Sequence, residues 1–170
     1  LRKITIYKEM GNFEEAERAL KRLYTLYPND TEIKEQFNYI RLDDAKEALN
    51  DKNYDNANKI YRTIIDENPD NKEAYLGLIK NELMKGNPDA ALQYTNRSLM
   101  EMPNDRQLVE KKIGLLEELG RHAQAIAYIN ELDQDKFKDI YSRTLPYLMQ
   151  QSAGFNEFND SYEINKKLVE

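Results

Sequence analysis

Three residue types recur along this chain at one spacing, and that spacing limits the fold more than any other feature. Alanines stand 41, 34 and 34 residues apart, at Ala16, Ala57, Ala91 and Ala125. Prolines repeat the first two intervals, at Pro28, Pro69 and Pro103. Glycines follow the same period at Gly11, Gly86, Gly120 and Gly154, with Lys52 in the place of a missing glycine. Such a period indicates an array of similar units, each too small to bury its apolar face alone.

Each unit is predicted to be two helices joined by a tight turn. Glycine ends the first helix because it tolerates a left-handed backbone, and alanine lets the two helices pack closely. Proline stops the second helix, and the Asn or Asp behind it can cap the next one. The capping pairs are Asn29 and Asp30, Asp70 and Asn71, and Asn104 and Asp105. The register predicts helices over 1–10, 13–26, 31–51, 54–67, 72–85, 88–101, 106–119 and 122–133.

The helix predicted over 31–51 is longer than the others because the first interval exceeds the period by seven residues, close to two helical turns. An apolar stripe formed by Ile33, Phe37 and Ile40 leads to Ala45, which favours an elongated helix over a loop. The same helix carries Arg41 and Asp44 where large apolar residues are expected. Asp44 is expected to be solvated, and the alternative is an ion pair with Arg41, three residues before it on the same helix.

The period and its turns resemble the tetratricopeptide repeat. The matching turns run from Gly11 to Ala16, Lys52 to Ala57, Gly86 to Ala91 and Gly120 to Ala125. The resemblance implies an all-α fold, a right-handed α-α solenoid of helical hairpins. It implies four repeats in residues 1–133, which divide into 1–30, 31–71, 72–105 and 106–133.

Residues 134–170 are predicted to form a degenerate fifth repeat or a capping segment. Gly154 keeps the period, but Asn159, Glu163 and Lys166 stand where small or apolar residues belong, and Pro146 is expected to interrupt the preceding helix. The first unit lacks the opening residues of its first helix. The chain is therefore expected to be a fragment of a longer protein.

Composition excludes several classes of function. The net charge is −6, whereas a nucleic-acid binder needs a basic face to neutralise phosphates. No apolar run approaches the ~20 residues that cross a bilayer, so we expect no membrane insertion in this segment. The chain has no cysteine, which excludes disulfides, thiol catalysis and cysteine-based metal sites, and this absence does not select a compartment.

We find no catalytic, cofactor or metal site in the sequence, and predict that the chain is not an enzyme. His122 is the single histidine, and packing between helices explains it better than catalysis or metal binding. No glycine-rich phosphate loop occurs. Neighbouring carboxylates such as Asp43 and Asp44 are inevitable among 31 acidic residues and are expected to be solvated.

The resemblance also implies a binding surface, because the first helices of stacked repeats line a concave groove in this family. Carried over by position, the groove would consist of Tyr39, Leu42, Lys46, Leu49, Leu76, Lys80, Leu83, Met84 and Lys111. If Leu42, Leu76 and Leu83 face the groove, their apolar surface is exposed to solvent unless a ligand covers it, and exposed apolar patches mark binding sites. The alternative is that these leucines pack between neighbouring helices.

One known type of groove can be compared directly. Co-chaperone domains of this family hold a partner's C-terminal carboxylate with basic and asparagine side chains. The asparagines expected in the first helices fall on Ile6 and Asp43, or on Lys46 and Gly77 one unit later. The sequence therefore argues against that terminal-carboxylate clamp.

The function predicted from the resemblance is a protein–protein interaction scaffold that binds a partner protein or peptide in the groove. A narrower alternative is a periplasmic repeat segment of a bacterial envelope or outer-membrane secretion or assembly protein. A second alternative is a self-associating structural solenoid, because the end faces of a truncated array are apolar.

Overall fold

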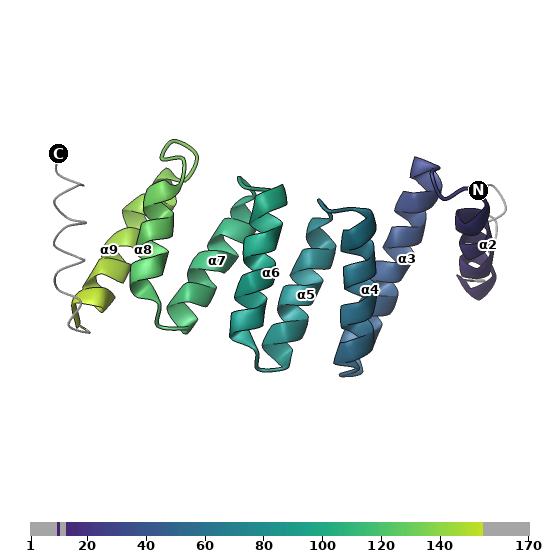
Figure 1. Ribbon diagram of the computed structural model, residues 1–170, viewed down its shortest axis with the longest axis horizontal. Helices are drawn as coiled ribbons and strands as arrows, with labels where there is room; N and C mark the ends of the chain where they lie inside the picture. Colours follow the sequence, from purple (N-terminus) through teal and green to yellow (C-terminus); the bar gives the residue numbers. More distant parts are fainter. Residues whose placement is uncertain (1–9, 11–12, 155–170) are drawn as a thin grey trace. The chain divides into compact units, whose positions relative to one another are not determined.

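The computed structural model describes Met10 and residues 13–154, and every regular element in these residues is an α-helix. The chain divides into two compact units, Leu1–Lys85 and Gly86–Glu170 (Figure 1). The helix predicted over 1–10 and the tail residues Asn159, Glu163 and Lys166 lie outside the described residues. Each unit is a run of antiparallel helices in which every helix packs on the next along the chain.

Unit 1 contains four described helices, and their bounds follow the predicted register closely. They are α2 (Phe13–Leu26), α3 (Thr31–Asn50), α4 (Tyr54–Glu67) and α5 (Lys72–Met84). Helices α3 and α5 also contact each other directly, besides packing on α4. The first helices of two successive hairpins therefore lie side by side.

Unit 2 contains the remaining four helices, α6 (Pro88–Glu101), α7 (Arg106–Glu118), α8 (His122–Glu131) and α9 (Lys138–Gly154). Helix α9 continues through Pro146, so the predicted interruption at this residue is wrong. The helix holds because Leu145 and Leu148, on either side of the proline, are 3% and 0% exposed and anchor it to the core.

The helix starts are set by the predicted caps. Asp30, Asn71 and Asp105 each accept a hydrogen bond from the backbone N–H three residues on, at Ile33, Ala74 and Leu108. Each such bond satisfies one of the amides that the first helical turn leaves unpaired, and contributes about 1 kcal/mol. The residue behind each proline turn therefore fixes where the next helix begins.

The turns between paired helices use the left-handed backbone that the glycines predicted. Gly86 and Gly120 have φ of 77° and 67°. Lys52 has φ of 61° and is the only non-glycine residue with positive φ in the described part of the chain. Lys52 therefore takes the conformation of the glycine it replaces, at a steric cost that glycine would not incur.

The extra residues before Ala45 are helical, as the apolar stripe predicted, and α3 is 20 residues long. Ile33, in the first turn of α3, joins Ala16 and Leu20 of α2 in a buried cluster. Phe37 stacks on Tyr24 of α2, with ring centroids 4.4 Å apart. The extension therefore packs against α2.

Arg41 does not pair with Asp44, so the alternative of an ion pair within α3 is wrong. Its guanidinium donates to the Glu67 carboxylate of α4 at 2.8 Å and lies over the Phe37 ring at 5.3 Å. The Tyr24 hydroxyl donates to the same carboxylate at 3.0 Å. Arg41 is 9% exposed, so its charge is neutralised inside a junction of α2, α3 and α4 instead of reaching a neighbour on its own helix.

The four alanines of the repeat are all buried, with exposed fractions of 1% or less. A methyl group at these positions lets helix backbones approach closely, as predicted. No helix of the described part of the chain is both long and apolar enough to cross a membrane.

Candidate partner-binding cleft

A cleft of about 300 Å³ opens between α3 and α5 in unit 1. Its residues come from two helix faces, because residues three and four apart project from the same side of a helix. The lining residues are Lys46, Leu49 and Asn50 of α3, Tyr61 of α4, and Glu73, Leu76, Gly77 and Lys80 of α5. We refer to this set as the α3–α5 cleft.

The floor of the α3–α5 cleft is the ring of Tyr61, which reaches it from α4. A Cβ atom built on Gly77 would lie 2.3 Å from Cε1 and Cζ of that ring, so glycine is the residue that admits the ring here. Tyr61 is 1% exposed. Burial raises the pKa of its phenol above the ordinary value, and the hydroxyl therefore stays protonated at neutral pH.

The charges of the α3–α5 cleft are two lysines and one glutamate. The ammonium of Lys46 lies 3.5 Å from Asp43, a loose pair between exposed side chains. Lys80 is exposed and forms no ion pair with any described residue. Glu73 lies on α5 seven residues before Lys80, about two helical turns away. The cleft thus offers an apolar floor and wall, from Tyr61, Leu49 and Leu76, beside uncompensated positive charge.

Four of the nine residues predicted for the groove line this cleft together: Lys46, Leu49, Leu76 and Lys80. Tyr39 lies on the same side of α3 as Lys46, seven residues before it, and is 63% exposed. Large exposed aromatic side chains are uncommon on monomer surfaces and are enriched at binding sites. Tyr39 therefore extends the candidate surface beyond the cleft.

The other predicted groove residues lie elsewhere. Leu42 is 5% exposed and belongs to the core, which matches the alternative interpretation for this leucine. Leu83 is half-buried and Met84 is 43% exposed near the end of α5, and neither lines the cleft. Lys111 is exposed on α7 in unit 2, where it borders a shallow depression with Glu110 and Glu118.

Sequence reasoning missed Tyr61 and Gly77 as parts of the surface. Tyr61 is buried, but its far end also forms the cleft floor. The signal for Gly77 was its place inside a helix at a position away from the turn glycines. A glycine inside a helix often marks a close approach of another group.

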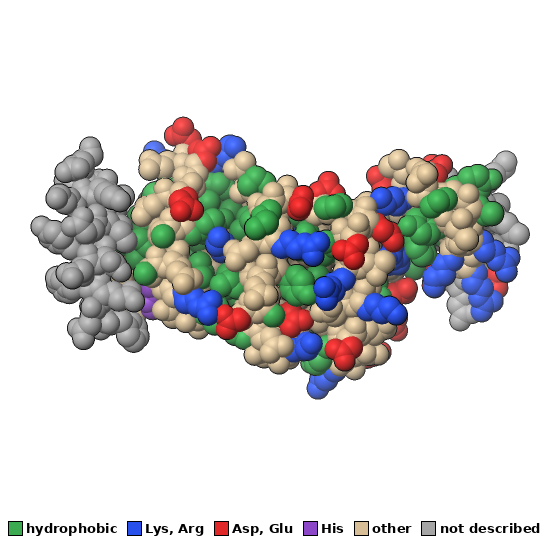
Figure 2. All heavy atoms as spheres, in the orientation of Figure 1, with side chains coloured by type: hydrophobic (Ala, Val, Ile, Leu, Met, Phe, Trp, Pro, Cys, Tyr) green, Lys and Arg blue, Asp and Glu red, His purple; other side chains and the backbone are tan. Residues whose placement is uncertain are grey.

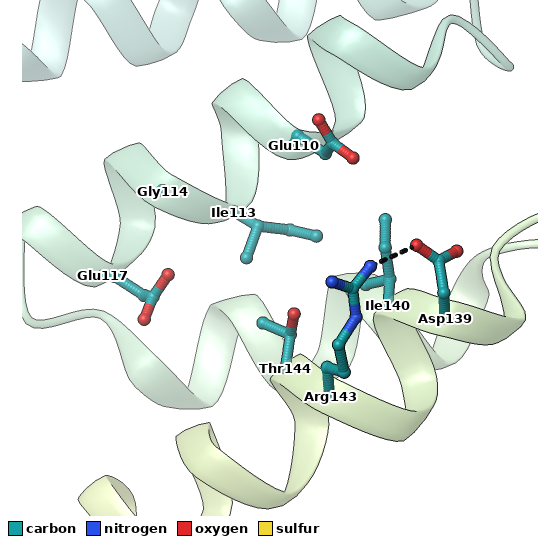
Figure 3. Close-up of a pocket in the computed structure, with 8 residues that line it drawn as sticks. All are labelled: Glu110, Ile113, Gly114, Glu117, Asp139, Ile140, Arg143 and Thr144. Carbon is teal, nitrogen blue, oxygen red and sulfur yellow. Dashed lines mark hydrogen bonds and ion pairs between the residues drawn. The ribbon is translucent and has the colours of Figure 1, made fainter.

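Unit 2 has a cleft of about 290 Å³ between its own α7 and α9, with a different charge pattern. Glu110, Ile113 and Glu117 of α7 face Ile140 and Arg143 of α9 across it (Figure 3). Arg143 donates to Asp139 at 2.8 Å, and Arg106 of α7 binds the same carboxylate. The Arg106 hydrogen bond lowers the pKa of Asp139 to about 2. These ion pairs join the two helices, so we interpret this cleft as structural.

The single histidine and the acidic side chains are the candidate residues for metal binding. His122 is half-buried at the first position of α8, and no group of His, Asp and Glu side chains in the described part of the chain could hold a metal ion. On the face drawn in Figure 2, acidic and basic side chains are interspersed with apolar ones.

Comparisons with known proteins agree with the hairpin architecture. Two family models described as tetratricopeptide repeat match residues 1–30 and 41–112. No curated protein matches the chain. Among solved structures, MamA is 18% identical with a TM-score of 0.51, over 96% of this chain and 90% of that one.

Two further structures are similar. The RS-1 ArsTM double mutant of MamA is 16% identical with a TM-score of 0.50, over 98% of this chain and 93% of that one. A tetratricopeptide repeat protein from Parabacteroides merdae ATCC 43184 is 23% identical with a TM-score of 0.42, over 98% of this chain and 61% of that one. At these identities the MamA structures show a common fold and nothing of function. With its repeat period, its capped helical hairpins and the two family-model matches, this chain belongs to the tetratricopeptide repeat family.

Proposed function

We propose that this protein-interaction scaffold binds an extended or helical segment of a partner protein on the α3–α5 face of unit 1, without catalysis. The observation that carries the proposal is the α3–α5 cleft, where an apolar floor lies between two lysines of adjacent parallel helices. An apolar side chain of the partner would fill the cleft and contact Leu49 and Leu76. Tyr39, exposed on the same side of α3, would cover the segment next to the cleft.

The energetics favour an anchor of this kind. A buried apolar side chain contributes about 1.5–3 kcal/mol when it leaves water, and a few such anchors dominate the affinity of most interfaces. Leu76 is the half-buried leucine of the cleft, so part of its surface is available to a ligand. Leu49 is already 2% exposed and acts as a fixed wall.

The proposal is tested with peptides selected from a random display library on the immobilised chain. The peptides are then tested against Leu76→Gln, which removes the apolar contact from the cleft without placing a charge in it. Leu119→Gln is the matched control, because Leu119 is also half-buried but lies at the end of α7 in unit 2. Circular dichroism confirms that both variants keep their helices.

We expect a class of selected peptides that binds the wild type and the Leu119→Gln variant equally and binds Leu76→Gln at least about tenfold more weakly. Peptides that bind all three proteins alike would place the binding surface outside this cleft and remove the proposal.

A further inference from the structure

The hydroxyl of Tyr61 is not enclosed, although the rest of its side chain is buried. Tyr61 is 1% exposed, and none of the described residues forms a hydrogen bond with its hydroxyl. A tyrosine hydroxyl at the edge of the core usually has a hydrogen-bond partner, either a protein group or water. The Tyr61 hydroxyl is therefore an accessible donor that a group bound in the cleft can use.

The hydroxyl end of the ring faces the α3–α5 cleft. Cζ, the atom that carries the hydroxyl, is one of the ring atoms nearest to Gly77, and Gly77 and Tyr61 both line the cleft. With a side chain at Gly77 the ring could not reach this position. Glycine thus opens the path from a buried tyrosine on α4 to the surface between α3 and α5.

Two ammonium groups line the same cleft. Lys80 forms no ion pair among the described residues, and Lys46 has a loose partner, Asp43, at 3.5 Å. A protonated hydroxyl and two cations are all donors, so an acceptor with negative charge complements all three at once. A carboxylate has two oxygens and can accept from several donors together.

The apolar walls of the cleft restrict which chemical group of the partner can present the carboxylate. Leu49 and Leu76 line the same cleft as Tyr61, and they favour methylene groups next to the acid. A C-terminal carboxylate would bring its own backbone amide against these leucines. That amide would have no hydrogen-bond partner there, and burying an unpaired amide costs free energy. An Asp or Glu side chain brings its carboxylate on a short apolar stem and leaves the peptide backbone outside.

We propose that the α3–α5 cleft recognises the carboxylate of one Asp or Glu side chain in a partner segment, with Tyr61, Lys46 and Lys80 as the three donors. This specificity rests on the proposed function, since it requires a partner segment in the same cleft. Glu73, one helical turn before Gly77, repels a second carboxylate at that end. The preferred segment therefore carries a single acid flanked by apolar residues, instead of an acidic run.

The experiment uses the display-selected peptides that depend on Leu76. Each peptide is made with its Asp or Glu changed to Asn or Gln, and separately with its C-terminus amidated. Affinities for the wild type, Tyr61→Phe and Lys80→Gln are measured by fluorescence anisotropy. Tyr54→Phe is the matched control, because Tyr54 is a half-buried tyrosine of α4 outside the cleft.

We expect the acid-to-amide change to weaken binding to the wild type and to Tyr54→Phe by about tenfold, as a charge-assisted hydrogen bond does. The same change should matter much less for Tyr61→Phe and Lys80→Gln, because the donors are already missing. C-terminal amidation should have no effect.

Three results overturn the inference and are distinguishable from one another. Cleft-dependent peptides that lack acids, or that tolerate the amide change, remove the carboxylate specificity and leave the proposed function intact. Binding lost on C-terminal amidation assigns the carboxylate to a chain terminus. Selected peptides that ignore Leu76 remove the proposed function and this specificity together.

Discussion

The ring of Tyr61 occupies the space that a side chain at Gly77 would need. A Cβ atom on Gly77 would lie 2.3 Å from two ring carbons, far inside contact distance. The two residues come from adjacent helices, α4 and α5, and the tyrosine is 1% exposed. This pair joins the packing of unit 1 to the floor of its candidate binding cleft.

The first prediction tests that pair by substitution. Gly77→Ala should destabilise unit 1 by about 1–3 kcal/mol, because the ring or the helix must shift to admit a methyl group. Gly114→Ala is the matched control, since Gly114 is also inside a helix and has no atom within 4 Å of its Cβ position. That control should stabilise the chain by about 0.5–1 kcal/mol through helix propensity. Urea unfolding measures both, and equal effects of the two changes would contradict the close packing of Tyr61 on Gly77.

A second prediction concerns the turn at Lys52. Lys52→Gly should stabilise the chain by up to about 1 kcal/mol, because glycine adopts the left-handed backbone at φ 61° without the Cβ clash of lysine. Lys59→Gly, inside α4, should destabilise by about 1 kcal/mol instead. Thermal unfolding of the two variants distinguishes them. A loss of stability in Lys52→Gly would show that the lysine contributes something other than its backbone conformation.

The third prediction addresses the buried charge of α3. Arg41→Ala should cost about 1–3 kcal/mol, because the Glu67 carboxylate loses its guanidinium partner in a largely enclosed site. Lys136→Ala removes an exposed ion pair with Asp133 and should change stability by less than about 0.5 kcal/mol. If Arg41 and Glu67 are coupled, Glu67→Gln should reduce the cost of Arg41→Ala in a double-mutant cycle. Strict additivity of the two changes would refute the coupling.

A fourth prediction follows from the ion pairs of α9. Hydrogen bonding to Arg106 lowers the pKa of Asp139 from its ordinary 3.8 to about 2. A carboxyl group with a lowered pKa in the folded state stabilises fully above its unfolded pKa, and that contribution is lost as the pH falls toward the folded value. Unit 2 should therefore lose stability between about pH 4 and 2.

Asp139→Asn should lower stability at neutral pH and flatten the acid dependence in that window. Asp135→Asn is the control, because Asp135 is exposed and has no ion pair among the described residues. Urea unfolding at a series of pH values measures the effect. An unchanged slope in Asp139→Asn would mean that this carboxylate does not join α7 to α9.

A fifth prediction concerns the lysines of the candidate binding surface. Lys46→Glu and Lys80→Glu should each weaken binding of the selected peptides, because both lysines line the α3–α5 cleft, whereas Lys111→Glu in unit 2 should leave it unchanged. Each exposed lysine carries one charge, so reversal of charge should act without unfolding the chain. Peptide affinity at low and high salt gives the comparison. An effect at Lys46 and Lys80 alone would confine the surface to unit 1.

Much of the fold could be predicted from the sequence because its determinants are local. Asp30, Asn71 and Asp105 cap the helices that follow them, and the capping bond spans three residues. The elongated α3 followed from an apolar stripe along one helix face. Pro146 shows the limit of local rules, because the packing of Leu145 and Leu148 holds α9 together through it.

The candidate site was predicted in part. The resemblance to the tetratricopeptide repeat implied Lys46, Leu49, Leu76 and Lys80 as groove residues by their repeat positions, and these four residues line the cleft. Repeat position could not separate them from Leu42, which is buried, or from Met84, which lies outside the cleft. The position of a residue along a helix determines the side of the helix from which its side chain projects. Whether that side chain is exposed depends on whether a neighbouring helix covers that side.

The sequence by itself determined the repeat register, the caps, the left-handed turns and the helix bounds, since each rests on hydrogen bonds and steric limits among residues a few positions apart. The tertiary structure alone decided that Arg41 pairs with Glu67, 26 residues away, and that Tyr61 meets Gly77 across two helices. The physical reason is that such contacts depend on the depth and angle at which whole helices pack. Local propensity does not encode that geometry.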